Sequence, residues 1–141
     1  MFGGKNGLFV VCLALLPAVT LSVRQCKYEV QLSTGHKYWS GTDEDIHIRI
    51  RENGPWHNLD NPDADDFERH QTDSFQFEDN CVNRHQQTTV GIAAYGKYMA
   101  CGGDKWLLIY VKLISKDRHW INEWATYKWF SCADMLTLPR K

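Results

Sequence analysis

Two alternating segments, separated by an acidic loop, constrain the fold of this chain more than any other feature. Isoleucine stands at every second position of 46–50, with polar residues between, and the turn residues Gly41, Thr42 and Asp43 come shortly before. An acidic loop follows at 60–69, and then a second segment that begins at Asp73. Alternation with a period of two predicts strands with one buried face. A turn, a half-buried strand, a polar loop and a second strand in this order predict a β-sandwich with functional loops at one end, and not an enzyme pocket.

Strand patterns recur along the rest of the chain. We predict strands within 28–33, 46–51, 75–77, 88–94, 106–114, 120–121, 123–127 and 128–131. The segment 106–114 is apolar on both faces, which is typical of a strand in the middle of a sheet. Four tryptophans in these segments are expected to pack in the core: Trp106, Trp120, Trp124 and Trp129. No helix of ten residues is expected after the N-terminal segment, so the fold class is all-β.

The N-terminal segment predicts export. Lys5 precedes an apolar run at 8–21, which is the length of a signal-peptide core and too short to cross a bilayer comfortably as a helix. Thr20 and Ser22 supply small residues for cleavage after Ser22; cleavage slightly earlier and a retained anchor helix are the alternatives. We expect residues 1–22 to be a cleaved signal peptide and residues 23–141 to form a single secreted, extracellular domain. The rest of the sequence contains no second apolar run of the length that predicts a transmembrane segment.

Four cysteines follow the predicted signal peptide: Cys26, Cys81, Cys101 and Cys132. An even number of cysteines in an exported domain favours two disulfides over a metal site. Three pairings are possible. We favour Cys26–Cys132, which would tie the first strand to the last, together with Cys81–Cys101.

Charge and motifs argue against several classes of function. The formal net charge of the 141-residue chain is −1, whereas nucleic-acid binding usually needs a basic face. The Gly-x-Ser-x-Gly motif of hydrolases and a phosphate-binding glycine loop are both absent from the sequence. The six histidines are scattered and are expected to be solvated. We therefore expect no enzyme activity, no nucleic-acid partner and no cofactor on the ground of these motifs.

The order of short motifs resembles the PLAT domain, also called the lipoxygenase homology domain. The motifs are Tyr-x-Val-x-Leu-x-Thr-Gly at 28–35, Gly-Thr-Asp at 41–43, the alternating strand at 46–50, Leu-Asp-Asn at 59–61, Phe-Glu-Arg at 67–69, Asp-x-Phe at 73–75, and Trp106 with Val111. The resemblance spans most of 27–131 and includes the single-domain secreted members of the family. It implies an eight-stranded antiparallel β-sandwich that binds lipid surfaces or proteins, often with calcium.

The resemblance also implies a calcium site. In calcium-binding relatives the Gly-Thr-Asp loop supplies oxygen ligands; Gly41 and Asp43 occupy those places here, and Asp45 is near. The remaining ligands usually come from the loop after the strand at 90–92, but this chain has Ala, Tyr, Gly and Lys at 94–97. Asp104, farther along that loop, is the nearest substitute. The alternative is that Thr42 and Asp43 only cap a turn.

The acidic loop does not predict a calcium site of its own. Asn61, Asp63 and Asp65 alternate as in an EF-hand, but Asp66 stands where that motif needs glycine and Thr72 stands where it needs glutamate. We predict a solvated turn, with Phe67 buried and the flanking charges at its rim.

Aromatic residues in loops predict a membrane-facing end. Lys37, Tyr38 and Trp39 lie in the turn between the first two strands, and Trp56 and Tyr98 lie in other loops. In lipoxygenase relatives an aromatic residue near the first of these loops enters the bilayer, and tryptophan prefers the membrane interface. The alternative is that these rings cover the open ends of the sandwich.

We therefore expect a secreted, non-enzymatic module that engages lipid or membrane surfaces through one loop end, with calcium assisting. The alternative is a secreted protein-interaction or effector module, of the defence, stress or venom type, that does not bind lipid. An enzyme or its regulatory subunit is the least favoured class.

Overall fold

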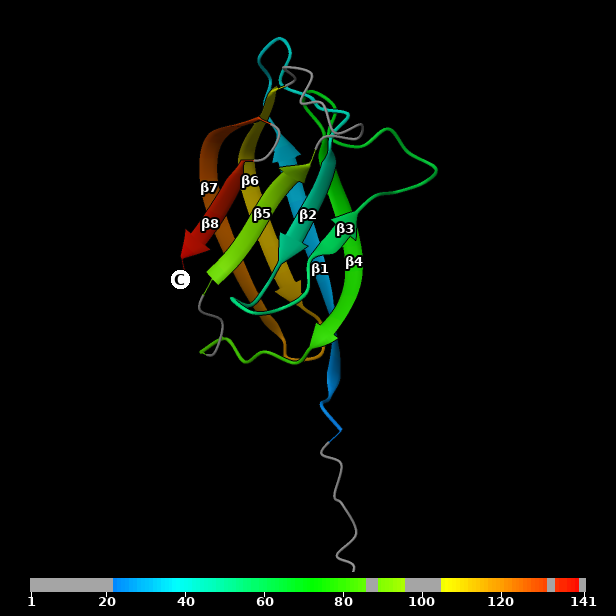
Figure 1. Cartoon of the computed structure of the whole chain (residues 1–141), viewed down its shortest axis with the longest axis vertical. Helices are drawn as coiled ribbons and strands as arrows, with labels where there is room; N and C mark the ends of the chain where they lie inside the picture. Colours follow the sequence, from blue (N-terminus) through cyan, green and yellow to red (C-terminus); the bar gives the residue numbers. More distant parts are fainter. Residues whose placement is uncertain (1–21, 86–88, 96–104, 132–133, 140–141) are drawn as a thin grey trace, which may run out of the picture.

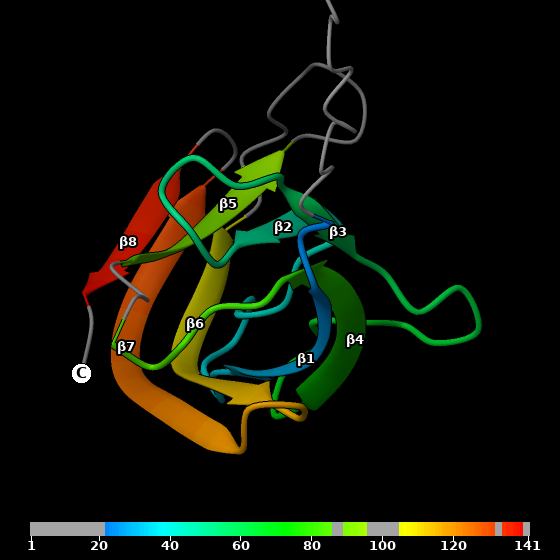
Figure 2. The ribbon, with the colours of Figure 1, turned by 90° about the horizontal axis from the view of Figure 1, so that it is seen from below.

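The computed structural model describes residues 22–85, 89–95, 105–131 and 134–139, which form two antiparallel sheets packed face to face (Figures 1 and 2). One sheet has the strand order β4-β1-β6-β7 and contains β1 (Gln25–Thr34), β4 (Thr72–Asn80), β6 (Lys105–Ser115) and β7 (Trp120–Ser131). The other has the order β3-β2-β5-β8 and contains β2 (Asp45–Arg49), β3 (His57–Leu59), β5 (Thr89–Tyr95) and β8 (Met135–Pro139). The predicted eight-stranded sandwich is confirmed. The predicted signal peptide lies outside the described residues, except for its last residue.

Antiparallel order brings two long connections to the same end of the sandwich. Segment 35–44 joins β1 to β2, and segment 60–71 joins β3 to β4; both lie at the upper end in Figure 1. We call this end, formed by 35–44 and 60–71, the loop end. The connection at 50–56, between β2 and β3, lies at the opposite end.

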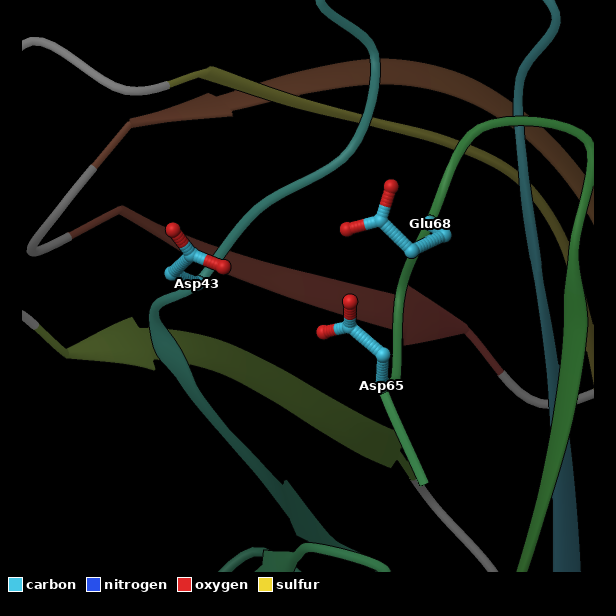
Figure 3. Close-up of side chains that lie close together, drawn as sticks. All are labelled: Asp43, Asp65 and Glu68. Atoms are coloured by element: carbon cyan, nitrogen blue, oxygen red, sulfur yellow. The ribbon is translucent and has the colours of Figure 1, made fainter.

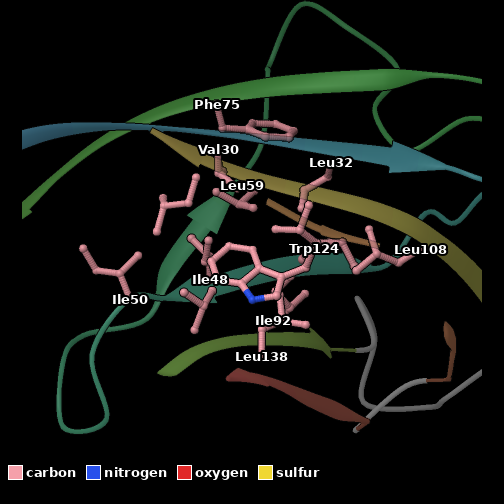
Figure 4. Packing of buried hydrophobic residues seen from close by; sticks show 14 of the residues in the cluster. Val30, Leu32, Ile48, Ile50, Leu59, Phe75, Ile92, Leu108, Trp124 and Leu138 are labelled. Carbon is pink, nitrogen blue, oxygen red and sulfur yellow. The ribbon is translucent and has the colours of Figure 1, made fainter. Parts of the chain in front are cut away.

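Alternating side chains of both sheets fill the core between them (Figure 4). Val30 and Leu32 of β1 face Ile48 of β2 and Ile92 of β5, and all four are fully buried. Burial of one such side chain contributes about 1.5–3 kcal/mol to folding. Alternation read from the sequence therefore identifies the inner face of each of these strands.

Three of the four strand tryptophans are buried as predicted, and each indole N–H has an acceptor. Trp106 donates to Thr34 Oγ1 at 2.9 Å, Trp120 to the carbonyl of Val82 at 3.0 Å, and Trp124 to the carbonyl of Pro139 at 2.8 Å. The prediction for Trp129 was wrong, because its side chain is 38% exposed. Its neighbour Phe130 points inward, and alternation turns Trp129 outward.

The strands that the sequence patterns missed are short or irregular. β3 has only three residues, too few for a clear alternation, and in β8 the outward positions include the apolar residues Met135 and Pro139, which hide the alternation. The three short strands predicted over 120–131 are one strand, β7, whose register against β6 shifts between Leu108 and Tyr110. Tyr127, beside this irregularity, has a φ of 46°. The apolar segment at 106–114 lies in β6, between β1 and β7, as its composition predicted.

The favoured disulfide pairing was wrong. Cys26 is bonded to Cys81, and their Cα atoms lie 4.8 Å apart. The two residues meet because β1 and β4 are antiparallel neighbours, with Gln25 opposite Asn80. A bridge across 55 residues contributes about 4 kcal/mol in the loop-entropy model. Cys101 and Cys132 lie outside the described residues.

The two sheets are also joined along one open edge. Asp79 of the edge strand β4 is buried, and its carboxylate lies 3.0 Å from the guanidinium of Arg51 and 3.0 Å from Nε2 of His57. His57 belongs to β3, the edge strand of the opposite sheet, and its ring stacks on Phe77 with centroids 4.6 Å apart. Asp79 thus fastens the edge of one sheet to the edge of the other.

Candidate functional site

Segment 35–44 is fastened to β6 at both ends of its aromatic turn. The N–H of Gly35 donates to the carbonyl of Leu107 at 2.8 Å, and the N–H of Leu107 donates to the carbonyl of Ser40 at 2.9 Å. A Cβ atom at position 35 would lie 2.5 Å from the side chain of Leu107, so this close approach requires glycine. The chain between Gly35 and Ser40 is therefore anchored to β6 at both of its ends.

Tyr38 and Trp39 form the tip of this segment. Their side chains are 78% and 84% exposed, and their ring centroids lie 6.4 Å apart in an edge-to-face arrangement. Trp39 has a φ of 61°, a left-handed conformation that is uncommon for a bulky residue. Backbone strain of this kind clusters at binding sites. Both rings stand in solvent and do not cover the end of the core.

Three carboxylates come together beside the aromatic pair. Asp43, Asp65 and Glu68 are exposed, and their nearest oxygens all lie within 4.8 Å of one another (Figure 3). Asp43 comes from segment 35–44, and the other two come from segment 60–71. Calcium takes six to eight oxygen ligands, and carboxylates bind it through one oxygen or two. The three side chains could therefore hold a calcium ion, each through at least one carboxylate oxygen. We call this group the acidic triad.

Backbone contacts at Phe67 hold the two segments of the triad together. The N–H of Thr42 donates to the carbonyl of Phe67 at 3.3 Å. The N–H of Phe67 donates in turn to the buried carboxylate of Asp73 at 2.8 Å, and the ring of Phe67 packs on Trp106 in the core. A Cβ atom at Gly41 would lie 3.0 Å from the Phe67 carbonyl oxygen, so glycine lets the two segments approach closely.

Two hollows flank Asp43. The larger is an open groove of about 400 Å³, with Tyr38, Trp39, Glu68 and Arg69 among its lining residues. The smaller, of about 110 Å³, is lined by six carboxylates together with Thr42, Leu59, Ala64 and Phe67. The six carboxylates are those of Asp43, Glu44, Asp45, Asp60, Asp65 and Asp66. Asp43 and Thr42 line both hollows, so a cation bound here would lie beside the aromatic groove.

The structure groups some of the predicted site residues and separates others. Gly41 lines the larger hollow, Asp45 lines the smaller one, and Asp43 lines both. Lys37 is exposed and precedes Tyr38 and Trp39 in the chain. Asp104 and Tyr98 lie outside the described residues.

Trp56 does not join the loop end. Its neighbour His57 pairs with Ile48, far along β2 from Asp45. The ring of Trp56 is half-buried under the guanidinium of Arg49, 4.7 Å from its centroid, and packs against Gly91. Trp56 thus covers the outer face of β2 and β5 at the other end of the sandwich.

Sequence reasoning missed Asp65 and Glu68, which it assigned to a solvated turn. The signal that could have found them is the burial of Phe67, which was predicted and is confirmed. A buried residue between them draws the acidic segment onto the core, next to the Gly-Thr-Asp turn. The rejection of an EF-hand agrees with this geometry. Asp65 lies next to Asp43, which belongs to another segment, whereas an EF-hand would group Asp65 with Asn61 and Asp63 of its own loop.

The family model of the PLAT/LH2 domain matches residues 28–135, well over half of the chain. The chain belongs to the PLAT/LH2 domain family. No curated protein sequence matches it. Within the described residues, no helix is long and apolar enough to span a membrane.

Solved structures show the same fold in parts of larger proteins. The alpha-toxin of Clostridium absonum is 25% identical, with a TM-score of 0.64; the match covers 83% of this chain and 32% of the toxin. Coral 8R-lipoxygenase, whose structure is described as showing calcium activation via a C2-like domain, is 19% identical, with a TM-score of 0.66 and coverage of 80% and 16%. A calcium-dependent 11R-lipoxygenase is 20% identical, with a TM-score of 0.57 and coverage of 81% and 17%. The chain therefore spans less than a third of the length of each.

Proposed function

We propose that this PLAT domain protein is a secreted, non-enzymatic module that binds lipid membranes through its loop end, with calcium held by the acidic triad. The observation that carries the proposal is the position of two solvent-exposed rings, Tyr38 and Trp39, directly beside three converging carboxylates. Family membership supports it, because PLAT domains are typically membrane-binding or lipid-binding modules and some of them use calcium.

The aromatic tip is suited to insertion at a membrane interface. A tryptophan or tyrosine ring buries about 150–250 Å², and apolar burial is worth about 25 cal/mol per Å². Trp39 and Tyr38 are already exposed, and their segment is anchored at Gly35 and Ser40, so the structure presents both rings to solvent, where they can meet a membrane. Lys37, next to Tyr38, adds attraction to anionic headgroups of about 1 kcal/mol.

Calcium would remove the main electrostatic obstacle to membrane binding. Carboxylates dominate the hollows around Asp43, and they repel phosphate groups. An ion held by Asp43, Asp65 and Glu68 would neutralise part of this charge and keep coordination positions for lipid phosphate oxygens. Coral 8R-lipoxygenase is activated by calcium via its C2-like domain, and the 11R-lipoxygenase is calcium-dependent. Both support a role for calcium in this domain as well.

The calcium site is tested by thermal unfolding of the oxidised protein in calcium and in chelator. We expect calcium to raise the melting temperature of the wild-type protein and to leave that of Asp43→Asn nearly unchanged, because a ligand that binds only the folded state stabilises it. Glu52→Gln, which removes an exposed carboxylate at the opposite end, is the matched control and should respond like the wild type. If calcium raised the melting temperature of Asp43→Asn as much as that of the wild type, the assignment of the calcium site to Asp43 would be contradicted.

Co-sedimentation with vesicles tests the membrane role. Vesicles containing anionic lipid should bind the protein more strongly in calcium than in chelator. A failure to bind any vesicle in either condition would overturn the membrane proposal and favour the alternative of a protein partner.

A further inference from the structure

We propose that His36 and His70 form a site for a divalent late transition-metal ion such as Cu²⁺ or Zn²⁺. The two histidines are separate from the acidic triad, and neither belongs to the described residues that line the two hollows around Asp43. The inference goes beyond the proposed function, because it requires neither a lipid nor calcium.

The fold brings these two histidines together from distant parts of the sequence. His36 and His70 lie in different segments of the loop end, and both side chains are exposed. The N–H of His70 donates to the carbonyl of Gly35 at 3.2 Å, and the N–H of Thr34 donates to the carbonyl of Gln71 at 2.8 Å. These two bonds hold the backbone around His70 against the residues just before His36. The two side chains are therefore neighbours, although the sequence shows only scattered histidines.

The spacing of the two rings suits a shared metal ion. The ring centroids of His36 and His70 lie 5.8 Å apart, with 33° between the ring planes. A histidine nitrogen binds such an ion at about 2.0–2.1 Å, which places the ring centroid about 3.2 Å from the ion. Two ligand rings at a tetrahedral angle then have centroids about 5.2 Å apart, and rings on opposite sides of the ion about 6.4 Å apart. The observed separation lies between these limits, and rotation about the side-chain bonds can turn a nitrogen of each exposed ring towards the ion.

The histidine pair suits a different class of ion from the acidic triad. Imidazole nitrogen suits zinc, copper and nickel, whereas calcium takes oxygen ligands. Among the described residues, the acidic triad is the only group of three or more metal-ligating side chains that converge, so water would complete the coordination of an ion at the histidines. Affinity rises along the first transition row to copper and falls again at zinc, so Cu²⁺ should bind more tightly than Zn²⁺.

Coordination by both rings has a signature that two independent histidines lack. Once one imidazole holds the ion, the second bond forms within the same molecule and adds affinity through its high effective concentration. Removal of either ring should therefore weaken binding sharply. Two independent histidines would each bind an ion weakly, and removal of one would leave the affinity of the other unchanged.

Titration calorimetry of the oxidised protein with CuCl₂ and ZnCl₂, in excess calcium, measures the affinity. His36→Gln and His70→Asn should each weaken Cu²⁺ binding at least tenfold, which corresponds to about 1.4 kcal/mol. Asparagine suits position 70, because the backbone there is left-handed, with a φ of 64°. His119→Asn is the matched control and should bind like the wild type. His119 is also exposed, has a φ of 52°, and lies between β6 and β7 at the opposite end of the sandwich.

NMR of the histidine rings identifies the residues that bind the ion. Substoichiometric Cu²⁺ should broaden the ring signals of His36 and His70 together, before those of His119, and Zn²⁺ should shift both. Unchanged Cu²⁺ affinity in His36→Gln and His70→Asn, or broadening of one ring without the other, would overturn the site. Loss of Cu²⁺ binding in Asp43→Asn, with none in His36→Gln, would place the ion at the acidic triad and also overturn it. These readouts involve no lipid, so the membrane function stands or fails separately.

Discussion

The buried carboxylate of Asp73 accepts a 2.8 Å hydrogen bond from the backbone N–H of Phe67, and this bond fixes the segment that carries two of the three triad carboxylates. Phe67 has a φ of 62°, and its own carbonyl accepts the N–H of Thr42 from the other segment. The geometry of the acidic triad therefore depends on Asp73, a residue near the start of β4 that is not itself a member of the triad.

Asp73→Ala should lower both stability and calcium response. The substitution leaves the N–H of Phe67 buried without this acceptor, which costs about 1–3 kcal/mol. Asp73→Asn keeps an acceptor oxygen and should lose less. Burial raises the pKa of the Asp73 carboxyl in the folded state. Ionisation of Asp73 therefore lowers the free energy of unfolding; this loss is absent below the unfolded-state pKa and complete above the folded-state pKa. Unfolding by urea, with and without calcium, measures both effects; an unchanged midpoint for Asp73→Ala would show that the bond does not hold the segment.

Gly41→Ala should weaken calcium binding with only a small loss of stability. The new Cβ atom would lie 3.0 Å from the carbonyl oxygen of Phe67, a backbone atom that cannot rotate away, so Asp43 would shift relative to Glu68. Gly54→Ala is the control for calcium binding, because Gly54 lies in the connection at the opposite end and its Cβ atom would meet the side chain of Arg51 at 3.3 Å or more. Calcium titration followed by calorimetry should show weaker binding for Gly41→Ala alone. Equal affinities in both variants would mean that the close approach at Gly41 is not needed.

Asp79→Ala should destabilise the domain by about 3 kcal/mol, because it leaves Arg51 and His57 without the carboxylate that joins the two sheets. Glu78→Ala, one position along the same strand, removes an exposed carboxylate and should stay within about 0.5 kcal/mol of the wild type. Guanidinium unfolding curves compare the two. A similar small effect in both variants would show that the edge contact does not stabilise the sandwich.

Lys116→Ala should raise the pKa of Glu29. The ammonium of Lys116, 2.8 Å away, together with Gln31 and Ser74, lowers the folded-state pKa of Glu29 to about 2. Since the folded pKa is depressed, this interaction stabilises the protein above the unfolded value of 4.5, and the stabilisation is lost as the pH falls towards 2. Titration of the Glu29 carboxyl carbon by NMR should show a midpoint closer to 4.5 in the variant. Lys112→Ala, which removes a partner of Glu123, should leave the Glu29 midpoint where it is.

The sequence predicted what depends on periodicity and missed what depends on contacts between distant segments. Alternation identified the buried faces of β1 and β2, because a half-buried strand repeats every two residues, and a continuous apolar run identified β6. β3 is too short to show that period, and in β8 the apolar residues Met135 and Pro139 on the outward side hide it. The bond between Cys26 and Cys81 required the neighbour relation of β1 and β4, which periodicity does not contain. Asp43 was proposed from its turn motif, whereas Asp65 and Glu68 reach it only through the burial of Phe67.

Co-sedimentation of the oxidised protein in calcium with vesicles that contain anionic lipid, comparing the wild type with Trp39→Ala and Ile121→Ala, tests the central claim most directly. Trp39 projects from the loop end and Ile121 is exposed at the opposite end. The account predicts that the wild type and Ile121→Ala sediment with the vesicles, and that Trp39→Ala stays in solution with an unchanged melting temperature. Equal sedimentation of all three proteins would contradict the claim that the loop end inserts into membranes.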